Sequence, residues 1–286
     1  MTLNAAVASG NGFVVMASDR RRVRRDSNGV IVEAYDDEKK VIRLTDKVLL
    51  TSGGKVGIAA AAVAMIAQRI EPDFDLAQCK EVLEEVIRKT KEMDTHNALD
   101  DTETLGLIFN GFYDDGRLGV VHYGSGPGAE VVEKTCEDTK FFHVNSYPRS
   151  VERDVGSALT NVCLYLDEAE EANVTFQDAI ERALGLYVFG SYIAPEVSPT
   201  CDFRVLYLED GQIRYKAMEF DVTRFQKHLP TVESVKRILL DDYADMMVEK
   251  DLFGEVRSNE RIAIAETNPH DVTFRFRTIG SEWTRT

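Results

Sequence analysis

The sequence has few of the residues and patterns that mark metal-binding, disulfide-stabilised or membrane proteins. Its five histidines are scattered along 286 residues, so neither a metal site nor a cofactor is predicted. No apolar run approaches the length of a membrane span, and the first residues lack the basic-then-apolar pattern of a signal peptide. A soluble, cytoplasmic protein is therefore expected. The four cysteines lie far apart, without the spacing of zinc sites or disulfide frameworks, and are expected to be reduced and mostly buried: Cys79, Cys136, Cys163 and Cys201.

Clustered positive charge is also scarce. The chain has 34 Lys and Arg against 49 Asp and Glu, a formal net charge of -15. Nucleic acid and anionic membranes are therefore not expected as partners, because both require grouped basic side chains. One basic segment, DRRRVRRD at 19–26, breaks the pattern. A solvated loop with Asp at either end is the favoured interpretation of this segment over a binding patch.

Strand-like and helix-like segments alternate in groups along the chain. The turn signals SGNG, DDG and EDG separate paired β segments. Thr175, followed three residues later by Asp178, predicts a capped helix start. The predicted elements are a hairpin over 4–19, two short strands over 39–54, helices over 55–72 and 75–96, strands over 104–124 and 140–146, helices over 154–173 and 175–192, and a hairpin over 201–220.

The order of these elements predicts the fold class and the domain division. Strands, two helices, strands, two helices and strands indicate two facing sheets with helices outside each, an α+β four-layer αββα sandwich. Residues 1–221 are predicted to form this domain. A Thr-capped amphipathic helix over 229–251 and a hairpin over 261–279 then predict a small C-terminal helix-plus-hairpin extension, residues 222–286.

Four short segments occur in an order and spacing similar to those of the proteasome β-type subunit family. The sequence resembles the bacterial proteasome-like peptidases of that family and its stand-alone homologue, the ancestral beta subunit. The resemblance covers residues 2–220 and implies the N-terminal nucleophile hydrolase fold. The segments are NGFVVMASD at 11–19, KKVIRLTDKVLLTSGG at 39–54, DVGSAL at 154–159 and LYLEDGQI at 206–213.

The resemblance implies that Thr2 is a nucleophile. Once Met1 is removed, a terminal threonine carries both a hydroxyl that attacks a carbonyl and a free α-amine that accepts its proton. One residue then does the work of a nucleophile–base pair. The plainer interpretation is that Thr2 begins an edge strand, where threonine is common.

The resemblance also implies supporting catalytic residues. Lys40 is placed near the terminal amine, which it keeps basic, and Asp19 holds this lysine charged and oriented. Gly53 is assigned the backbone N–H that stabilises the oxyanion, and Ser157 a hydrogen bond near the amine. Each residue also has a structural explanation: a surface ion pair, a strand-to-helix turn or a helix N-terminal serine.

Two departures from the family pattern weaken the assignment. The closest ungapped match places Leu3, rather than Thr2, at the nucleophile position, and a one-residue insertion in the first hairpin restores Thr2. The family also has an aspartate shortly before a serine, where this sequence has Pro195 followed by Glu196. Glu196 is the residue that could replace that aspartate.

The sequence thus predicts an enzyme, a hydrolase of the threonine peptidase type that cleaves peptide bonds through an acyl-enzyme. The resemblance places Thr51 and Lys55 in the substrate pocket. It implies peptides or unfolded proteins as substrates and a homo-oligomer, and leaves an ATP-dependent regulator open as a partner. Two alternatives remain: a peptide ligase or transamidase that uses the same acyl-enzyme, and a non-catalytic proteasome homologue that forms an assembly.

Overall fold

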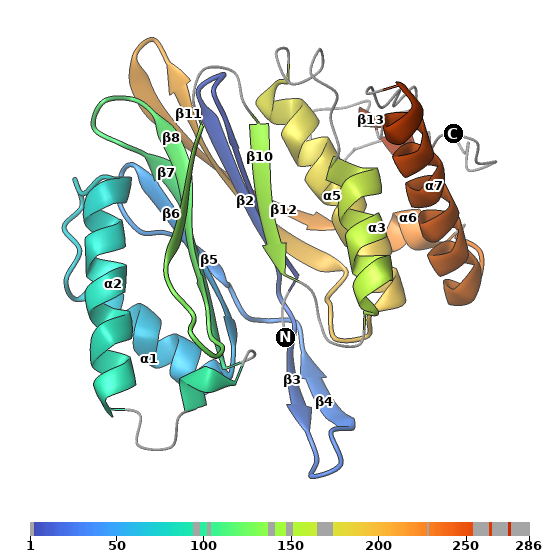
Figure 1. Cartoon of the computed structure of the whole chain (residues 1–286), viewed down its shortest axis with the longest axis horizontal. Helices are drawn as coiled ribbons and strands as arrows, with labels where there is room; N and C mark the ends of the chain where they lie inside the picture. Colours follow the sequence, from blue (N-terminus) through green and yellow to red (C-terminus); the bar gives the residue numbers. More distant parts are fainter. Residues whose placement is uncertain are drawn as a thin grey trace.

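Two five-stranded antiparallel sheets form the centre of the structure (Figure 1). The computed structural model describes residues 3–93, 98–101, 104–136, 141–146, 151–164, 174–227, 229–253, 263–264 and 274–275. In spatial order, the first sheet contains β10 (Phe141–Ser146), β1 (Asn4–Ser9), β2 (Phe13–Asp19), β11 (Thr200–Glu209) and β12 (Gln212–Asp221). The second contains β5 (Val41–Arg43), β6 (Val48–Gly54), β7 (Leu105–Phe112), β8 (Leu118–Gly124) and β9 (Val132–Cys136).

The two sheets face each other across a layer of buried side chains. Side chains alternate between the faces of a strand, so even-numbered residues of β1 and β2, such as Ala6 and Met16, face the second sheet. They join a cluster with Leu49 of β6 and Ile108 of β7. Asn110 of β7 is also buried here, and its Nδ2 donates to the carbonyl oxygens of Val7 at 2.8 Å and Val15 at 3.1 Å. This side chain therefore hydrogen-bonds one sheet to the other.

Helices cover the outer face of each sheet. Helices α1 (Val56–Ala67) and α2 (Leu76–Met93) lie over the second sheet, and a short 3-10 turn follows at Ala98–Asp100. Helices α3 (Arg153–Leu164) and α5 (Phe176–Ile193) lie over the first sheet (Figure 1). The predicted start of α5 is confirmed. Thr175 and Asp178 form a reciprocal capping box, each side chain bonding the other residue's backbone N–H.

The predicted four-layer αββα sandwich of the N-terminal nucleophile hydrolase type is wrong for this structure. Helices α6 (Thr223–Gln226) and α7 (Val232–Phe253) follow the first sheet, and α7 packs outside α3 and α5 as a further layer (Figure 1). The cause lies in α5, where every residue from Ala179 to Gly190 is buried. A helix buried around its whole circumference needs cover on the side away from the sheet as well. Val235 and Leu239 of α7 belong to the same buried cluster.

Two small antiparallel sheets stand apart from the five-stranded ones. One is the pair β13 (Ala263–Ile264) and β14 (Phe274–Arg275). The other is the β3–β4 hairpin, formed by β3 (Arg22–Arg25) and β4 (Ile31–Tyr35), which projects from the body of the molecule (Figure 1). Segment 19–26, expected to be a solvated loop, thus includes a whole β-strand.

Candidate functional site

Asp19, the last residue of β2, is the centre of the predicted site and is fully buried. Its Oδ1 accepts hydrogen bonds from the Arg21 N–H at 2.8 Å, from Lys40 Nζ at 3.1 Å and from the Ser198 N–H at 3.4 Å. Its Oδ2 accepts from the Leu3 N–H at 2.9 Å. A carboxylate can be buried at this depth because such donors replace its lost water.

Lys40 immediately precedes β5 and, of these four partners, is the one that bonds Asp19 through a charged group. Its side chain is 6% exposed, and its Nζ donates to Asp19 and, at 2.6 Å, to the carbonyl oxygen of Arg21. The structure therefore brings together Asp19 and Lys40, which are 21 residues apart in the sequence. The pair is an internal ion pair and not a surface one.

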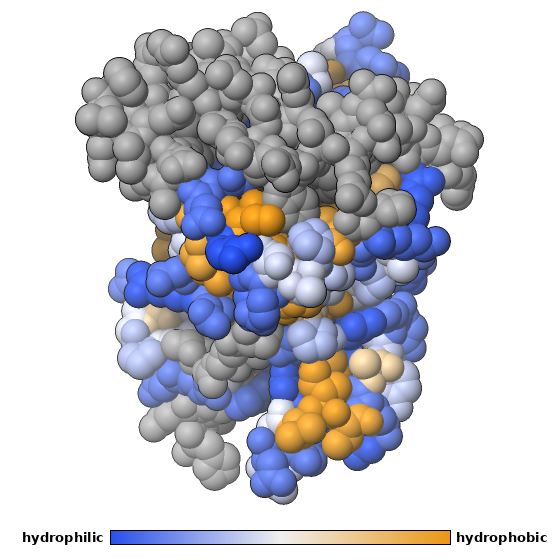
Figure 2. Space-filling view, turned by 90° about the vertical axis from the view of Figure 1, so that its right-hand side faces the viewer, coloured by the Kyte–Doolittle hydropathy of each residue, from blue (hydrophilic) through white to orange (hydrophobic). Residues whose placement is uncertain are grey.

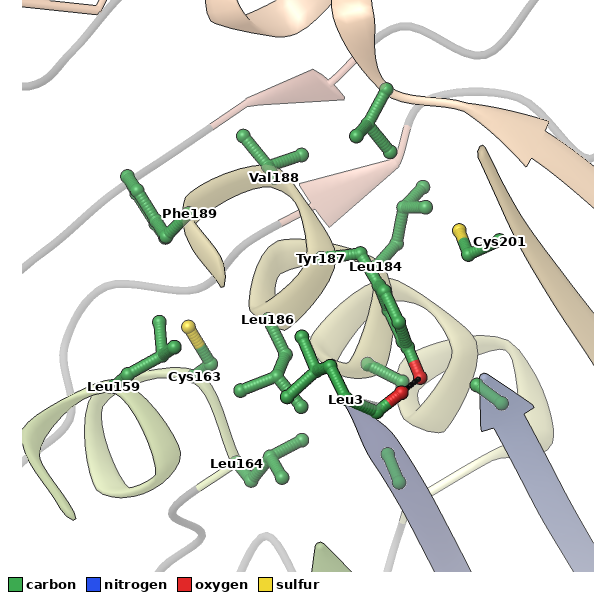
Figure 3. Packing of buried hydrophobic residues seen from close by; sticks show 14 of the residues in the cluster. Leu3, Leu159, Cys163, Leu164, Leu184, Leu186, Tyr187, Val188, Phe189 and Cys201 are labelled. Carbon is green, nitrogen blue, oxygen red and sulfur yellow. Dashed lines mark hydrogen bonds between the residues drawn. The ribbon is translucent and has the colours of Figure 1, made fainter. Parts of the chain in front are cut away.

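Leu3 occupies the strand position directly opposite Asp19. The β1–β2 register pairs Asn4 with Ser18, and one residue further Leu3 and Asp19 bond each other, with the Asp19 N–H donating to the Leu3 carbonyl at 3.2 Å. The Leu3 side chain is buried in the helix-side core, where the Tyr187 hydroxyl donates to its carbonyl at 2.9 Å (Figure 3). An aliphatic side chain cannot attack a carbonyl. Thr2 lies outside the described residues.

A cavity of about 280 Å³ lies beside the Asp19–Lys40 pair. Its walls come from the β3–β4 hairpin and its flanks, from the end of β6 and from the start of α1. Three residues predicted for the site line it, namely Lys40, Gly53 and Lys55. The other lining residues are Arg21, Arg22, Val23, Arg25, Glu38, Ser52, Gly54, Val56, Ala59 and Asp101.

Besides Asp19 itself, two described residues predicted for the site are not among those that line this cavity. The Thr51 side chain is fully buried, and its hydroxyl donates to Asn4 Oδ1 at 3.2 Å between the sheets. Ser157 lies on α3, partly buried, and its carbonyl accepts from Asn161 Nδ2 at 2.8 Å. Among the described residues no hydrogen bond joins Ser157 to Asp19 or Lys40. Of the predicted site residues that the structure describes, Lys40 is therefore the only one that both bonds Asp19 and lines the cavity.

The cations that line the cavity are paired with carboxylates. The Arg21 guanidinium bonds both oxygens of Asp36 at 2.7 Å and thereby lowers the pKa of that carboxyl. Arg25 bonds Glu196 at 2.9 Å, so the residue proposed to replace the family aspartate instead holds the hairpin. The remaining pairs are Arg22 with Asp37 at 3.1 Å and Lys55 with Asp101 at 3.4 Å. The cavity is rich in ionic groups but largely balanced in charge.

A second buried carboxylate, Asp202 of β11, lies opposite Ser18 of β2 and was not expected from the sequence. It is 1% exposed, and its nearest cations, Arg20 and Arg204, each lie 3.7 Å from it, beyond hydrogen-bond range. Burial raises the pKa of Asp202, and the two arginines oppose that shift. Only the folded chain reveals this residue, because nothing in the segment CDF marks it as buried.

Solved structures share the overall fold of this chain, among them three structures of Anbu proteins. An Anbu (Gly-1) mutant from Hyphomicrobium sp. strain MC1 gives a TM-score of 0.54 at 16% sequence identity, covering 88% of this chain and 98% of that chain. The helical assembly of the Anbu complex from Pseudomonas aeruginosa gives 0.55 at 15%, covering 86% and 96%. Anbu from Hyphomicrobium sp. strain MC1 in another form gives 0.52 at 15%, covering 87% and 96%. No protein-family model and no curated protein matches the chain.

These neighbours correct the resemblance to the proteasome β-type subunit family. Anbu proteins are proteasome-like but distinct from β-type subunits. The physical reason for the error is that the segments behind the resemblance are strand and turn patterns. Such patterns report the fold, which several classes of protein share, and carry little information on the chemistry.

The helices of the described residues are too short or too polar to cross a membrane.

Proposed function

We propose that this chain is a non-catalytic, Anbu-like subunit that builds a homo-oligomeric assembly. The fold likeness to Anbu supports the assembly, since one of the neighbours is itself a helical assembly. The observation that carries the non-catalytic part is the pair of hydrogen bonds between Leu3 and Asp19, in which the Leu3 N–H donates to the Asp19 carboxylate and the Asp19 N–H donates to the Leu3 carbonyl. Leucine, with no nucleophilic atom, is thereby fixed at the strand position beside the buried Asp19–Lys40 pair.

The Asp19–Lys40 pair then has a structural role. It connects the end of β2, the start of β5 and the base of the β3–β4 hairpin through four backbone groups and one ammonium. A buried, fully bonded ion pair of this kind orients the segments that meet around it. In this role it shapes the cavity wall without taking part in a reaction.

The test combines intact mass with the size of the particle in solution. A peptide epoxyketone, which bonds both a hydroxyl and a free α-amine on one residue, is added to the purified full-length chain. We expect the probe to leave the intact mass of the chain unchanged. We also expect light scattering to show a particle larger than one chain. A chain that lacks Met1 and gains one probe would overturn the non-catalytic proposal, and a monomer at every concentration would overturn the assembly.

A second candidate, a threonine peptidase acting through Thr2, is favoured by one observation. Lys40 and Gly53 line the same cavity beside Asp19, as a catalytic ammonium and an oxyanion-binding N–H would. Its test is peptide turnover by Thr2→Ala, with Thr223→Ala, an exposed threonine at the start of α6, as the control. Turnover abolished only by Thr2→Ala favours the peptidase. A labelled amine in the product would mark the ligase form of the same chemistry.

A further inference from the structure

The β3–β4 hairpin is a two-stranded sheet with one apolar face. Val23 and Ala34 pair and so lie on one side of it, and the next apolar residue, Val32, sits at the register shift between the Arg24 and Arg25 pairs; these three residues are here called the hairpin apolar face. Val32 is 46% exposed, and Val30 at the turn is 59% exposed. Figure 2 shows a hydrophobic patch on the lowest part of the molecule, the level of this hairpin in Figure 1. An apolar face on a projecting element is the mark of an interaction surface.

The opposite face of the hairpin carries its charges in pairs. Arg24 bonds Glu33 across the two strands, and the Arg22 guanidinium lies 4.9 Å from the ring centre of Tyr35. At the turn end of β3, Arg25 bonds the buried Glu196. An isolated hairpin of two strands is marginally stable in water, so these contacts hold it in shape. The hairpin is therefore held out from the body with its charges balanced, which lowers the entropy cost of docking.

Helix α1 supplies an uncharged surface next to the same cavity. Its twelve residues include no charged side chain, in a chain that is 29% charged. Val56, Ala60 and Ala64, spaced four residues apart, are all exposed and form one side of the helix. A helix that is apolar on all sides is usually covered on all sides. On α1 the covered sides are those that pack against the second sheet and α2, where Ala59, Ala62 and Ile66 are buried.

The net charge of the chain points to what covers these two surfaces. Two copies that each carry -15 repel one another over most of their area, so contact between them requires surfaces free of uncompensated charge. The hairpin apolar face and the uncharged side of α1 meet that requirement. The two surfaces also differ from each other. A head-to-tail contact, which can propagate an open helical assembly, joins two different surfaces of this kind.

We propose that the β3–β4 hairpin is an arm that lays its apolar face on the uncharged side of α1 in a second copy of the chain. The inference rests on the proposed assembly and names its contact surfaces. Because Val56 and Lys55 at the start of α1 also line the cavity, the arriving arm adds a wall to it. Each cavity is then completed by a neighbouring copy.

The first experiment replaces the exposed apolar residues of the arm with charged ones. Val30→Asp/Val32→Asp places carboxylates on the arm, while Val132→Asp alters a comparably exposed valine, 42% exposed, on β9 as the control. The expected result is a particle reduced to a single chain for the double variant, with the control still assembled and both thermal midpoints unchanged. An unchanged particle for the double variant would sink the inference and leave the assembly proposal standing. A wild-type monomer would sink both.

Cysteine cross-linking then tests the partner surface. The four native cysteines are buried, so single cysteines at Val32→Cys and Ala60→Cys react selectively with a short bis-maleimide. When the two variants are mixed, a cross-link between one copy of each is expected. The matched mixture of Val132→Cys with Ala60→Cys should give none. Cross-links of Val32→Cys to itself alone would mean that hairpins meet each other, and would overturn the assignment of α1 as the docking surface.

Discussion

The Leu3 N–H donates a 2.9 Å hydrogen bond to Oδ2 of Asp19, and the Asp19 N–H returns a 3.2 Å bond to the Leu3 carbonyl. The two residues close the β1–β2 ladder at its open end. Both side chains are buried, but in different surroundings: the leucine among apolar residues and the carboxylate among hydrogen-bond donors. The end of the ladder is therefore a fixed structural position, and the predictions below test what fixes it.

Lys40→Ala should destabilise the fold strongly. The change leaves the Asp19 charge buried without its cation, and breaking a buried pair by removing one partner costs about 3–5 kcal/mol. Lys39→Ala is the matched control, because Lys39 is the exposed neighbour in sequence. Urea unfolding followed by circular dichroism measures both. Equal midpoints for the two variants would show that the Asp19–Lys40 pair does not stabilise the fold.

Gly190→Ala should destabilise α5 against β1, although alanine usually favours a helix. A Cβ at Gly190 would lie 2.6 Å from Leu3 Cδ2, well inside contact distance. Overpacking of this kind costs about 1–3 kcal/mol. Chemical unfolding measures the loss, with Gly57→Ala as the control, since a Cβ there meets nothing within 4 Å.

The same contact makes a further prediction about coupling. Leu3→Ala opens space where the new Cβ would sit, so the double variant Leu3→Ala/Gly190→Ala should be more stable than the sum of the two single changes implies. Strict additivity in the double-mutant cycle would contradict the direct contact between Leu3 and Gly190.

Arg25→Met should loosen the β3–β4 hairpin from the body. Glu196 is 3% exposed on its side chain, and loss of a charged hydrogen-bond partner at a buried group costs about 1–3 kcal/mol. Hydrogen exchange of the backbone amides in the hairpin should therefore accelerate. Arg24→Met, which removes an exposed pair with Glu33, should leave the exchange of these amides nearly unchanged. Identical exchange in both variants would mean that Glu196 does not anchor the hairpin.

Asp202→Asn should reduce the dependence of stability on pH. Burial raises the folded-state pKa of Asp202 above its ordinary value, so its contribution to stability is full below that ordinary value and is lost as pH rises through the raised one. Asparagine does not titrate. The free energy of unfolding of wild type minus that of the variant should therefore fall as pH rises from the ordinary pKa of an aspartate, about 4, through the raised one. A constant difference over this range would contradict the raised pKa.

Local features of the fold were predictable from the sequence. The hairpin around SGNG and the cap at Thr175 follow from turn and capping chemistry that acts over a few residues. The approach of Lys40 to Asp19 was implied by the resemblance and is present. These features depend on short segments or on patterns that many proteins share.

The rest depends on which segments meet in space. That Leu3 bonds Asp19 follows from the strand register, which a one-residue shift of the first hairpin would change. Arg25 bonds a carboxylate 171 residues away in the sequence. The basic segment by itself contains no sign of this distant partner, so its own residues indicate only a solvated loop. The extra layer formed by α7 follows from the burial of α5 on all sides, a property of the packed structure.

Asn110 has a consequence for how the molecule can move. Its Nδ2 bonds two carbonyl oxygens of the facing sheet, so a slide of one sheet over the other by even one residue would break both bonds and leave these groups buried without their partners. Sliding of packed layers, a common mode of domain motion, is therefore blocked here. While the sheets behave as one rigid block, widening of the cavity falls to its rim, where the β3–β4 hairpin and the start of α1 form the walls.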